Sequence, residues 1–277
     1  MTSVVRLGRV GFLTIFGFIL IYPILWMVSA SFKPMPEIFS TINLIPSKFV
    51  TSSYVNGWRG TGQFGFSTFF VNSFLLVVPT VIFTVLSSVI VGYGFARFRF
   101  PLKNLLFSLM IATLMLPNAV IIIPSYLLFR DFGWLDTYWT FIIPAMFATY
   151  PFFVFMLVQF FRGLPRELDE SALIDGCSTF KILTRILLPL SKPAVVSAIV
   201  FQFIWIWNDF FNTLIYINSV KNFPISLGLR MSLDTSSTSN WDQVMAMSVL
   251  AILPCLVIFF LAQRYFVEGI ATTGIKG

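Results

Sequence analysis

Long runs of apolar residues alternate with short polar segments along the whole chain. A helix needs roughly 20 predominantly apolar residues to cross the hydrocarbon core of a bilayer, and six runs reach that length. These runs cover residues 10–32, 69–92, 104–129, 138–161, 194–217 and 244–267. The pattern predicts an all-α, polytopic membrane protein with about six transmembrane helices, organised as a single membrane domain over residues 1–277. The first run is too long for the apolar segment of a signal peptide, so we expect it to remain as a span.

The basic residues between the runs indicate an orientation. When the N-terminus is placed inside the cell, twelve of the 18 Lys and Arg residues fall in inner segments and six in outer segments. An excess of Lys and Arg on the cytoplasmic side is the usual arrangement in membrane proteins. The distribution therefore predicts that both termini are cytoplasmic.

Composition favours the lipid bilayer as the main surroundings of the chain. Hydrophobic residues make up 57% of the sequence and charged residues only 10%, whereas a soluble domain averages roughly 25% charged residues. The net charge is +7, but the basic residues lie between apolar runs, so nucleic acid is not expected as a partner. The sequence contains no His, the commonest general base and zinc ligand. Cys177 and Cys255 fall in a loop and in a span, so we expect neither a disulfide nor a metal pair.

The polar segment between the fourth and fifth runs, residues 162–193, has the pattern of a folded loop. Pro165 is followed within five residues by three acids, a composition that favours the first turn of a helix. Gly176 can adopt the left-handed conformation that ends a helix, and Ser178 or Thr179 can cap the next one. We predict a helix, a glycine turn and a second helix on the cytoplasmic side.

Apolar positions in this loop recur at helical spacing. Leu173, Cys177 and Phe180 stand at i, i+4 and i+7, so they can form an apolar stripe. The second helix would gather four apolar side chains on one face, namely Ile182, Leu183, Ile186 and Leu187. On pattern alone the loop also fits an amphipathic hairpin that rests on lipid headgroups.

A spaced motif in the same loop adds a family resemblance. Glu170-Ser171-Ala172 is followed after three residues by Gly176, and after nine more by Ile186-Leu187-Leu188-Pro189. This resembles the EAA loop of ABC importer permeases, whose signature is Glu-Ala-Ala, three residues, Gly, nine residues and Ile-x-Leu-Pro. Ser171 replaces the first Ala with another small residue. The resemblance implies that the loop docks on an ATPase and transmits its closure. The residues implied in coupling are Glu170, Ser171, Ala172, Leu173, Asp175, Gly176 and Cys177.

Other segments are similar to the second permease of carbohydrate ABC importers, the MalG-like group. They cover residues 22–26, 31–34, 72–73, 92–97 and 268–277. The resemblance implies the type I ABC importer permease fold in a bacterial or archaeal plasma (inner) membrane. It also implies a heteromer with a second permease subunit, two cytoplasmic ATPase subunits and an extracytoplasmic solute-binding protein. The ATPases would bind ATP and Mg²⁺, with no cofactor and no catalysis in this subunit.

One acidic residue, Asp209, lies within a predicted span, where an ionisable group usually faces a cavity or a partner. Trp205, Asn208, Asp209 and Asn212 are spaced so that they would share one face of a continuous helix. Asp and Asn match sugar hydroxyls as acceptors and donors, and an indole ring can stack on a sugar. This face is a candidate substrate path. The alternative is an interhelical hydrogen-bond cluster that fixes packing.

Other functions fit the pattern less well. A secondary transporter usually needs several buried ionisable groups, and this chain has one clear intramembrane acid. An intramembrane enzyme would need a motif such as Gly-x-Gly-Asp or His-Glu-x-x-His, and the sequence contains neither. A receptor or scaffold would leave the loop motif unexplained. Among importer substrates, a polyol or glycerol phosphate is the alternative to a sugar or oligosaccharide.

Overall fold

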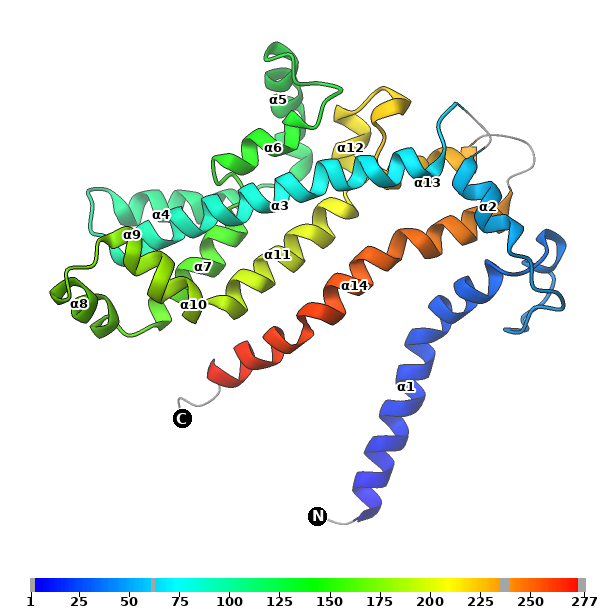
Figure 1. The fold of residues 1–277 in the computed structure, drawn as a ribbon, viewed down its shortest axis with the longest axis horizontal. Helices are drawn as coiled ribbons and strands as arrows, with labels where there is room; N and C mark the ends of the chain where they lie inside the picture. The colour runs from blue at the N-terminus through cyan, green and yellow to red at the C-terminus, as the bar shows by residue number, and fades with distance from the viewer. Residues whose placement is uncertain (1–2, 61–62, 235–239, 274–277) are drawn as a thin grey trace. The chain divides into compact units, whose positions relative to one another are not determined.

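The computed structural model describes residues 3–60, 63–234 and 240–273, and every regular element within them is helical (Figure 1). The prediction of an all-α fold is confirmed. The long helices are α1 (Ser3–Ala30), α3 (Phe66–Arg97) and α14 (Trp241–Thr273). The shorter ones are α2 (Ser52–Arg59), α4 (Lys103–Thr113), α5 (Asn118–Asp131), α6 (Trp139–Met146), α7 (Pro151–Gly163), α8 (Glu167–Ile174), α9 (Thr179–Ile182), α10 (Leu188–Leu190), α11 (Lys192–Trp207), α12 (Phe211–Tyr216) and α13 (Ile225–Asp234). Two 3-10 turns, η1 (Met35–Glu37) and η3 (Val220–Asn222), and one π-helix, η2 (Leu183–Leu187), complete the set. Residues 274–277 of the tail that adds to the family resemblance lie outside the described residues.

The number of possible membrane spans agrees with the sequence pattern. Four helical stretches are long and apolar enough to cross a membrane, namely Arg6–Ala30, Phe66–Arg97, Trp139–Gly163 and Trp241–Tyr265. Two bent pairs of helices pass the same test together, namely Lys103–Thr113 with Asn118–Asp131 and Thr179–Leu190 with Lys192–Trp207. If each pair forms one span, the count reaches the predicted six.

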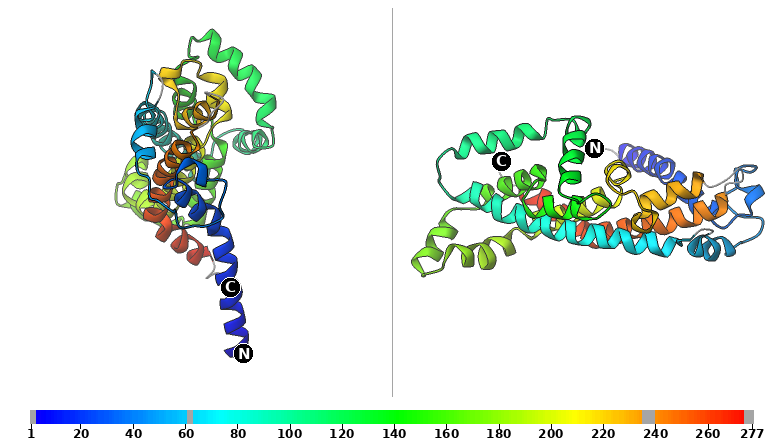
Figure 2. Two further views of the ribbon diagram at one scale, coloured as in Figure 1. Left: turned by 90° about the vertical axis from the view of Figure 1, so that its right-hand side faces the viewer. Right: turned by 90° about the horizontal axis from the view of Figure 1, so that it is seen from above.

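The third predicted span, residues 104–129, is not a single helix. Helices α4 and α5 meet at an angle of 102°, and this turn is visible from two further directions in Figure 2. Pro117, directly before α5, has an extended backbone with ψ 138°. Proline lacks the N–H that a helix needs and disfavours helical backbone in the residue before it. Because the residues around the break are apolar, the hydrophobic pattern does not reveal it.

The fifth predicted span, residues 194–217, is also divided. Helix α11 ends at Trp207, and α12 begins only at Phe211. The helical stretch Thr179–Leu190, which precedes α11, is bent by 79° against it. The predicted run therefore contains one long helix and a separate short one.

By its internal contacts the chain forms two compact units. The first consists of residues 1–70 and 227–254, and the second of residues 71–226 and 255–277. The expected single permease domain over residues 1–277 stays a prediction, and each unit is considered by itself.

In the first unit, polar contacts fix the segment that follows α1. Lys33 is fully buried, and its ammonium group donates a hydrogen bond of 2.5 Å to the carbonyl of Asn43. The hydroxyl of Ser53, also fully buried, donates to the carboxylate of Asp242 at 2.8 Å. These bonds satisfy polar groups that would be costly to bury alone. They close the loop after α1 and join α2 to the beginning of α14.

The core of the second unit forms where α3, α7 and α11 pack together. Its fully buried apolar side chains include Leu76, Val154, Leu157, Phe161 and Ala198. Gly92 allows α3 to approach α7 closely, since a Cβ at this position would lie 3.2 Å from the Cβ of Leu157. Gln202 of α11 donates to the hydroxyl of Thr84 on α3 at 3.0 Å. Such a bond satisfies polar groups that lipid cannot.

Candidate functional site

The segment of residues 162–193, named the coupling loop after the role that the family resemblance implies, folds as a helix, a glycine turn and a second helical stretch, as the sequence predicts. Helix α8 ends in a Schellman motif, with Cys177 N–H donating to the Ala172 carbonyl (2.9 Å) and Gly176 N–H to that of Leu173 (3.0 Å). Gly176 has φ +75°, which glycine adopts without a steric penalty. Ser178 then caps α9, since its hydroxyl oxygen accepts a hydrogen bond from the N–H of Lys181 at 3.4 Å.

The second helical stretch packs its apolar face against the protein. Ile182, Leu183 and Leu187 are buried, and Ile186 is half-buried. The predicted shared face is thereby confirmed. Its middle turns form the π-helix η2, a wider winding that often occurs at functional sites and that the spacing of apolar residues does not predict.

The turn between α8 and α9 presents apolar side chains to the outside. The side chains of Leu173, Ile174 and Phe180 are 54%, 88% and 69% exposed, while Cys177 is half-buried. The predicted stripe thus contributes two exposed members, and Ile174, which the stripe omitted, is more exposed than either. The rest of the implied coupling residues divide by exposure: Ala172 is buried, and Glu170, Ser171, Asp175 and Gly176 are exposed.

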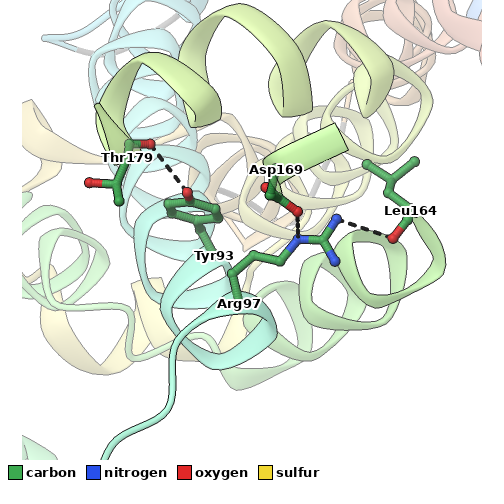
Figure 3. A network of polar contacts seen from close by, with 5 residues as sticks. All are labelled: Tyr93, Arg97, Leu164, Asp169 and Thr179. Atoms are coloured by element: carbon green, nitrogen blue, oxygen red, sulfur yellow. Dashed lines mark hydrogen bonds and ion pairs between the residues drawn. The ribbon is translucent and has the colours of Figure 1, made fainter. Parts of the chain in front are cut away.

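A buried polar network fastens the coupling loop to the C-terminal end of α3 (Figure 3). Arg97 Nε lies 2.9 Å from a carboxylate oxygen of Asp169 on α8, and the two side chains are only 7% and 16% exposed. Arg97 Nη2 also donates to the carbonyl of Leu164, just after α7, at 3.1 Å. One turn earlier on α3, the hydroxyl of Tyr93 donates to the carbonyl of Thr179 at 3.2 Å.

Burial and charge act in opposite directions on Asp169. Burial raises the pKa of its carboxyl from the ordinary value, and the Arg97 guanidinium works against this rise. Removing Arg97 would leave a buried carboxylate without its partner, which is strongly unfavourable. The sequence pattern predicts Arg97 only as one of the inner basic residues. The available signal was its place at the end of the Gly92–Arg97 segment that resembles the permease family.

The four predicted substrate-path residues do not share a face of one helix. Helix α11 ends at Trp207, and the carboxylate of Asp209 accepts hydrogen bonds from the N–H (3.0 Å) and the side-chain amide (2.8 Å) of Asn212. Asp209 thus caps the beginning of α12. Short polar side chains compete with helical hydrogen bonding in this way, so the helical spacing used for the prediction does not apply across the break.

The four residues fall into two pairs with different surroundings. Asp209 and Asn212 line a cavity of 490 Å³ in the second unit. Trp205 instead packs against Phe152, with ring centroids 5.0 Å apart. The side-chain amide of Asn208 lies 3.9 Å from the sulfur of Cys255. Asp209 and Asn212 alone keep the surroundings expected of a substrate path.

The remaining walls of the cavity come from residues that the sequence analysis did not select. Helices α5 and α6, with the segments after them, supply rings and hydroxyl groups, including Ser125, Phe129, Thr140, Phe141, Thr149 and Tyr150. None of the described residues that line the cavity is Lys or Arg. The cavity thus combines aromatic faces with neutral hydrogen-bonding groups and one carboxylate. The sequence carries no signal for these positions, because they lie on separate elements that meet only in the folded protein.

Comparisons with known proteins agree with these features. The family described as "Binding-protein-dependent transport system inner membrane component" matches residues 85–272. The chain is 34% identical to "Arabinooligosaccharides transport system permease protein AraQ" of Bacillus subtilis, over 99% of this chain and 97% of that protein. It is 32% identical to "sn-glycerol-3-phosphate transport system permease protein UgpE" of Brucella abortus, over 94% of each. Its fold is similar to that in a "Crystal structure of a bacterial ABC transporter involved in the import of the acidic polysaccharide alginate", with a TM-score of 0.83 and 21% identity over 95% of this chain and 96% of that chain.

Proposed function

The chain belongs to the family of binding-protein-dependent transport system inner membrane components, and we propose that it is a permease subunit of an ABC importer for a sugar or oligosaccharide. Together with a second permease subunit it forms the translocation path. Two cytoplasmic ATPase subunits bind ATP and Mg²⁺ and drive transport, and an extracytoplasmic solute-binding protein delivers the substrate. This subunit itself catalyses no reaction and holds no cofactor.

The observation that carries this proposal is the exposed apolar turn of the coupling loop. Leu173, Ile174 and Phe180 would remain in water if the turn had no partner, and burying side chains of this size yields roughly 1.5–3 kcal/mol each. Two exposed acids lie nearby, Glu170 on α8 and Asp175 at the end of that helix. The surface is suited to an apolar cleft with a basic rim on each ATPase, and the loop and both termini are therefore cytoplasmic.

The cavity lined by Asp209 and Asn212 supports a neutral, polyhydroxylated substrate. Aromatic rings can stack on the apolar faces of a sugar ring, and hydroxyl, amide and carboxylate groups can bind its hydroxyls. The similarity to a glycerol-phosphate permease raises an anionic solute as the alternative. A phosphate group would meet the carboxylate of Asp209 with no basic partner among the described lining residues, which favours the sugar.

Gly176→Leu tests the proposal, with Gly133→Leu as a matched control. Both glycines have positive φ, +75° and +69°, and an added Cβ would contact nothing at either. The backbone penalty of a left-handed conformation, roughly 1–2 kcal/mol, therefore applies equally. We expect Gly176→Leu to lose co-purification with the ATPases and uptake, while Gly133→Leu, in the loop after α5, retains both. Normal ATPase association and uptake in Gly176→Leu would contradict the docking role of the turn.

A further inference from the structure

The C-terminal end of α3 contacts residues of the coupling loop that lie 67 to 86 positions later in the sequence, and it contacts both helices of the loop. Arg97 holds α8 through Asp169, at 2.9 Å. Tyr93, one turn earlier, holds the first residue of α9 through the carbonyl of Thr179, at 3.2 Å. Two side chains on one face of α3 therefore fix the orientation of the whole helix–turn–helix (Figure 3).

The same end of α3 is packed tightly on the helix that leads into the loop. A Cβ at Gly92 would lie 3.2 Å from that of Leu157 on α7, and the ring of Tyr93 lies 6.3 Å from that of Phe161 in an edge-on arrangement. Arg97 adds its hydrogen bond to the carbonyl of Leu164, one residue beyond α7. Three positions in the last two turns of α3, Gly92, Tyr93 and Arg97, thus contact α7 or the loop.

The chemistry of the contact favours orientation over stability. A buried ion pair contributes little net stability compared with apolar residues of the same size, because both charges lose their water. It does impose a defined geometry: the guanidinium of Arg97 donates a hydrogen bond from Nη2 to the carbonyl of Leu164 and forms an ion pair through Nε with Asp169.

We propose that Arg97 is a positioning residue that makes the coupling loop and the inner end of α3 move as one body. The proposal rests on the proposed docking of the coupling loop on the ATPases. Through this connection, a displacement of the loop by the ATPases reaches α3 directly, in addition to α7 and α11, which adjoin the loop in the chain. Tyr93 assists by fixing α9 in the same orientation.

Hydrogen exchange measured by mass spectrometry tests the proposal on the assembled transporter of two permeases and two ATPases. The wild type is compared with and without a non-hydrolysable ATP analogue and Mg²⁺. We expect the nucleotide to change exchange in both the loop, residues 167–182, and the inner part of α3, residues 87–97. In Arg97→Gln the loop response remains, and the α3 response falls by at least about threefold.

Two further variants separate positioning from simple destabilisation. Arg97→Lys keeps the charge and is expected to retain part of the α3 response that Arg97→Gln loses. Arg99→Gln changes an exposed neighbouring residue and is expected to leave the α3 response unchanged.

If Arg97→Gln does not assemble, Tyr93→Phe, which removes one hydroxyl, should lower the α3 response while keeping the loop response. A double variant, Arg97→Asp with Asp169→Arg, exchanges the two charges and should restore the α3 response.

An α3 response that is unchanged in Arg97→Gln and Tyr93→Phe would overturn the proposal, as would an equal loss in Arg99→Gln. A wild type in which the loop responds to nucleotide and α3 does not would also overturn it. If addition of the ATPases gives the wild-type loop no protection at all, the docking function itself fails, and that result is distinguishable from the others.

Discussion

The coupling loop and the segment that joins α11 to α12 both interrupt a helical path, but different groups cause the two interruptions. In the loop, Gly176 takes a positive φ and two backbone bonds close the turn. Between α11 and α12, the carboxylate of Asp209 accepts two bonds from Asn212 and begins a new helix. A break encoded by glycine among polar residues can be recognised in a sequence. A break made by one side chain inside an apolar run cannot, because the run has the composition of an uninterrupted span.

The two regions also differ in what they present. The loop exposes the apolar side chains of Leu173, Ile174 and Phe180, a surface for a protein partner. The other segment directs polar groups of Asp209 and Asn212 into a cavity, a surface for a small solute. If this contrast is correct, changes in the two regions should fail in different ways.

The largest expected effect is in accessibility, because the loop is proposed to be cytoplasmic. In a Cys177→Ser, Cys255→Ser background, we expect Ser52→Cys to react with an impermeant thiol reagent on intact cells at least about a hundredfold faster than Ser178→Cys. Both positions are exposed in the structure, so burial does not explain the difference. Ser53 is unsuitable, since it is fully buried. Permeabilised cells provide the control, and labelling of Ser178→Cys in intact cells would reverse the assigned orientation.

The next effect concerns Asp209. Asp209→Ala removes a carboxylate that lines the cavity and can accept hydrogen bonds from a bound sugar. Each such bond is worth roughly 1 kcal/mol, and more with a charged acceptor, so uptake should fall about tenfold or more. Asp209→Asn keeps an acceptor oxygen, so its uptake should fall less than that of Asp209→Ala. Asn208→Ala, outside the cavity lining, serves as the control and should change uptake least.

Uptake alone does not separate binding from packing, so relative rates are also measured for several sugars. In assembled Asp209 and Asn212 variants the order of preference among sugars should change. A proportional loss for every sugar would assign these residues to packing and would leave the cavity without a substrate role.

A smaller effect is expected at the loop surface. Ile174→Ala removes most of an exposed apolar side chain and should weaken ATPase binding about tenfold, the equivalent of roughly 1.4 kcal/mol. Lys181→Ala, exposed on the second helix of the loop, is the matched control. Binding of the purified ATPase to the permease pair measures both. An effect of equal size in Lys181→Ala would show that charge on the loop, and not its apolar turn, drives docking.

The smallest effect concerns the loop between α5 and α6. Asp136 is partly buried, which raises its pKa, but hydrogen bonds from Ser219, Asn218 and Asn222 outweigh burial and leave the pKa of Asp136 below its ordinary value. A lowered pKa means that the ionised carboxylate stabilises the fold at pH values above the unfolded pKa. This contribution is lost as the pH falls through the folded pKa.

Asp136→Asn should therefore lower the melting temperature of the purified permease by about 2–4 °C at pH 7, as expected for roughly 1 kcal/mol. The difference from wild type should shrink as the pH falls below the ordinary pKa of an Asp carboxyl, about 3.9. A constant difference across this range would show that the effect does not depend on the charge of Asp136.

The sequence by itself determined the features that depend on local chemistry. Apolar runs of sufficient length predicted the helical fold and the number of spans, since lipid leaves few alternatives to a helix. The coupling loop was also predictable, because caps, turns and packing faces are encoded within a few residues. Its signals were the acids in the first turn of α8, Gly176 at the turn, and the apolar face of the second helix.

Tertiary structure alone decided the features that depend on distant residues. The bend at Pro117 and the cap at Asp209 lie inside apolar runs, and residues of α5, α6 and α12 meet around one cavity. Arg97 meets Asp169 at the end of α3 that packs closely on α7 at Gly92. Hydrophobic periodicity records which side of a helix is apolar, but it does not record which helix lies against that side, and the cavity and the Arg97 contact are both made between helices.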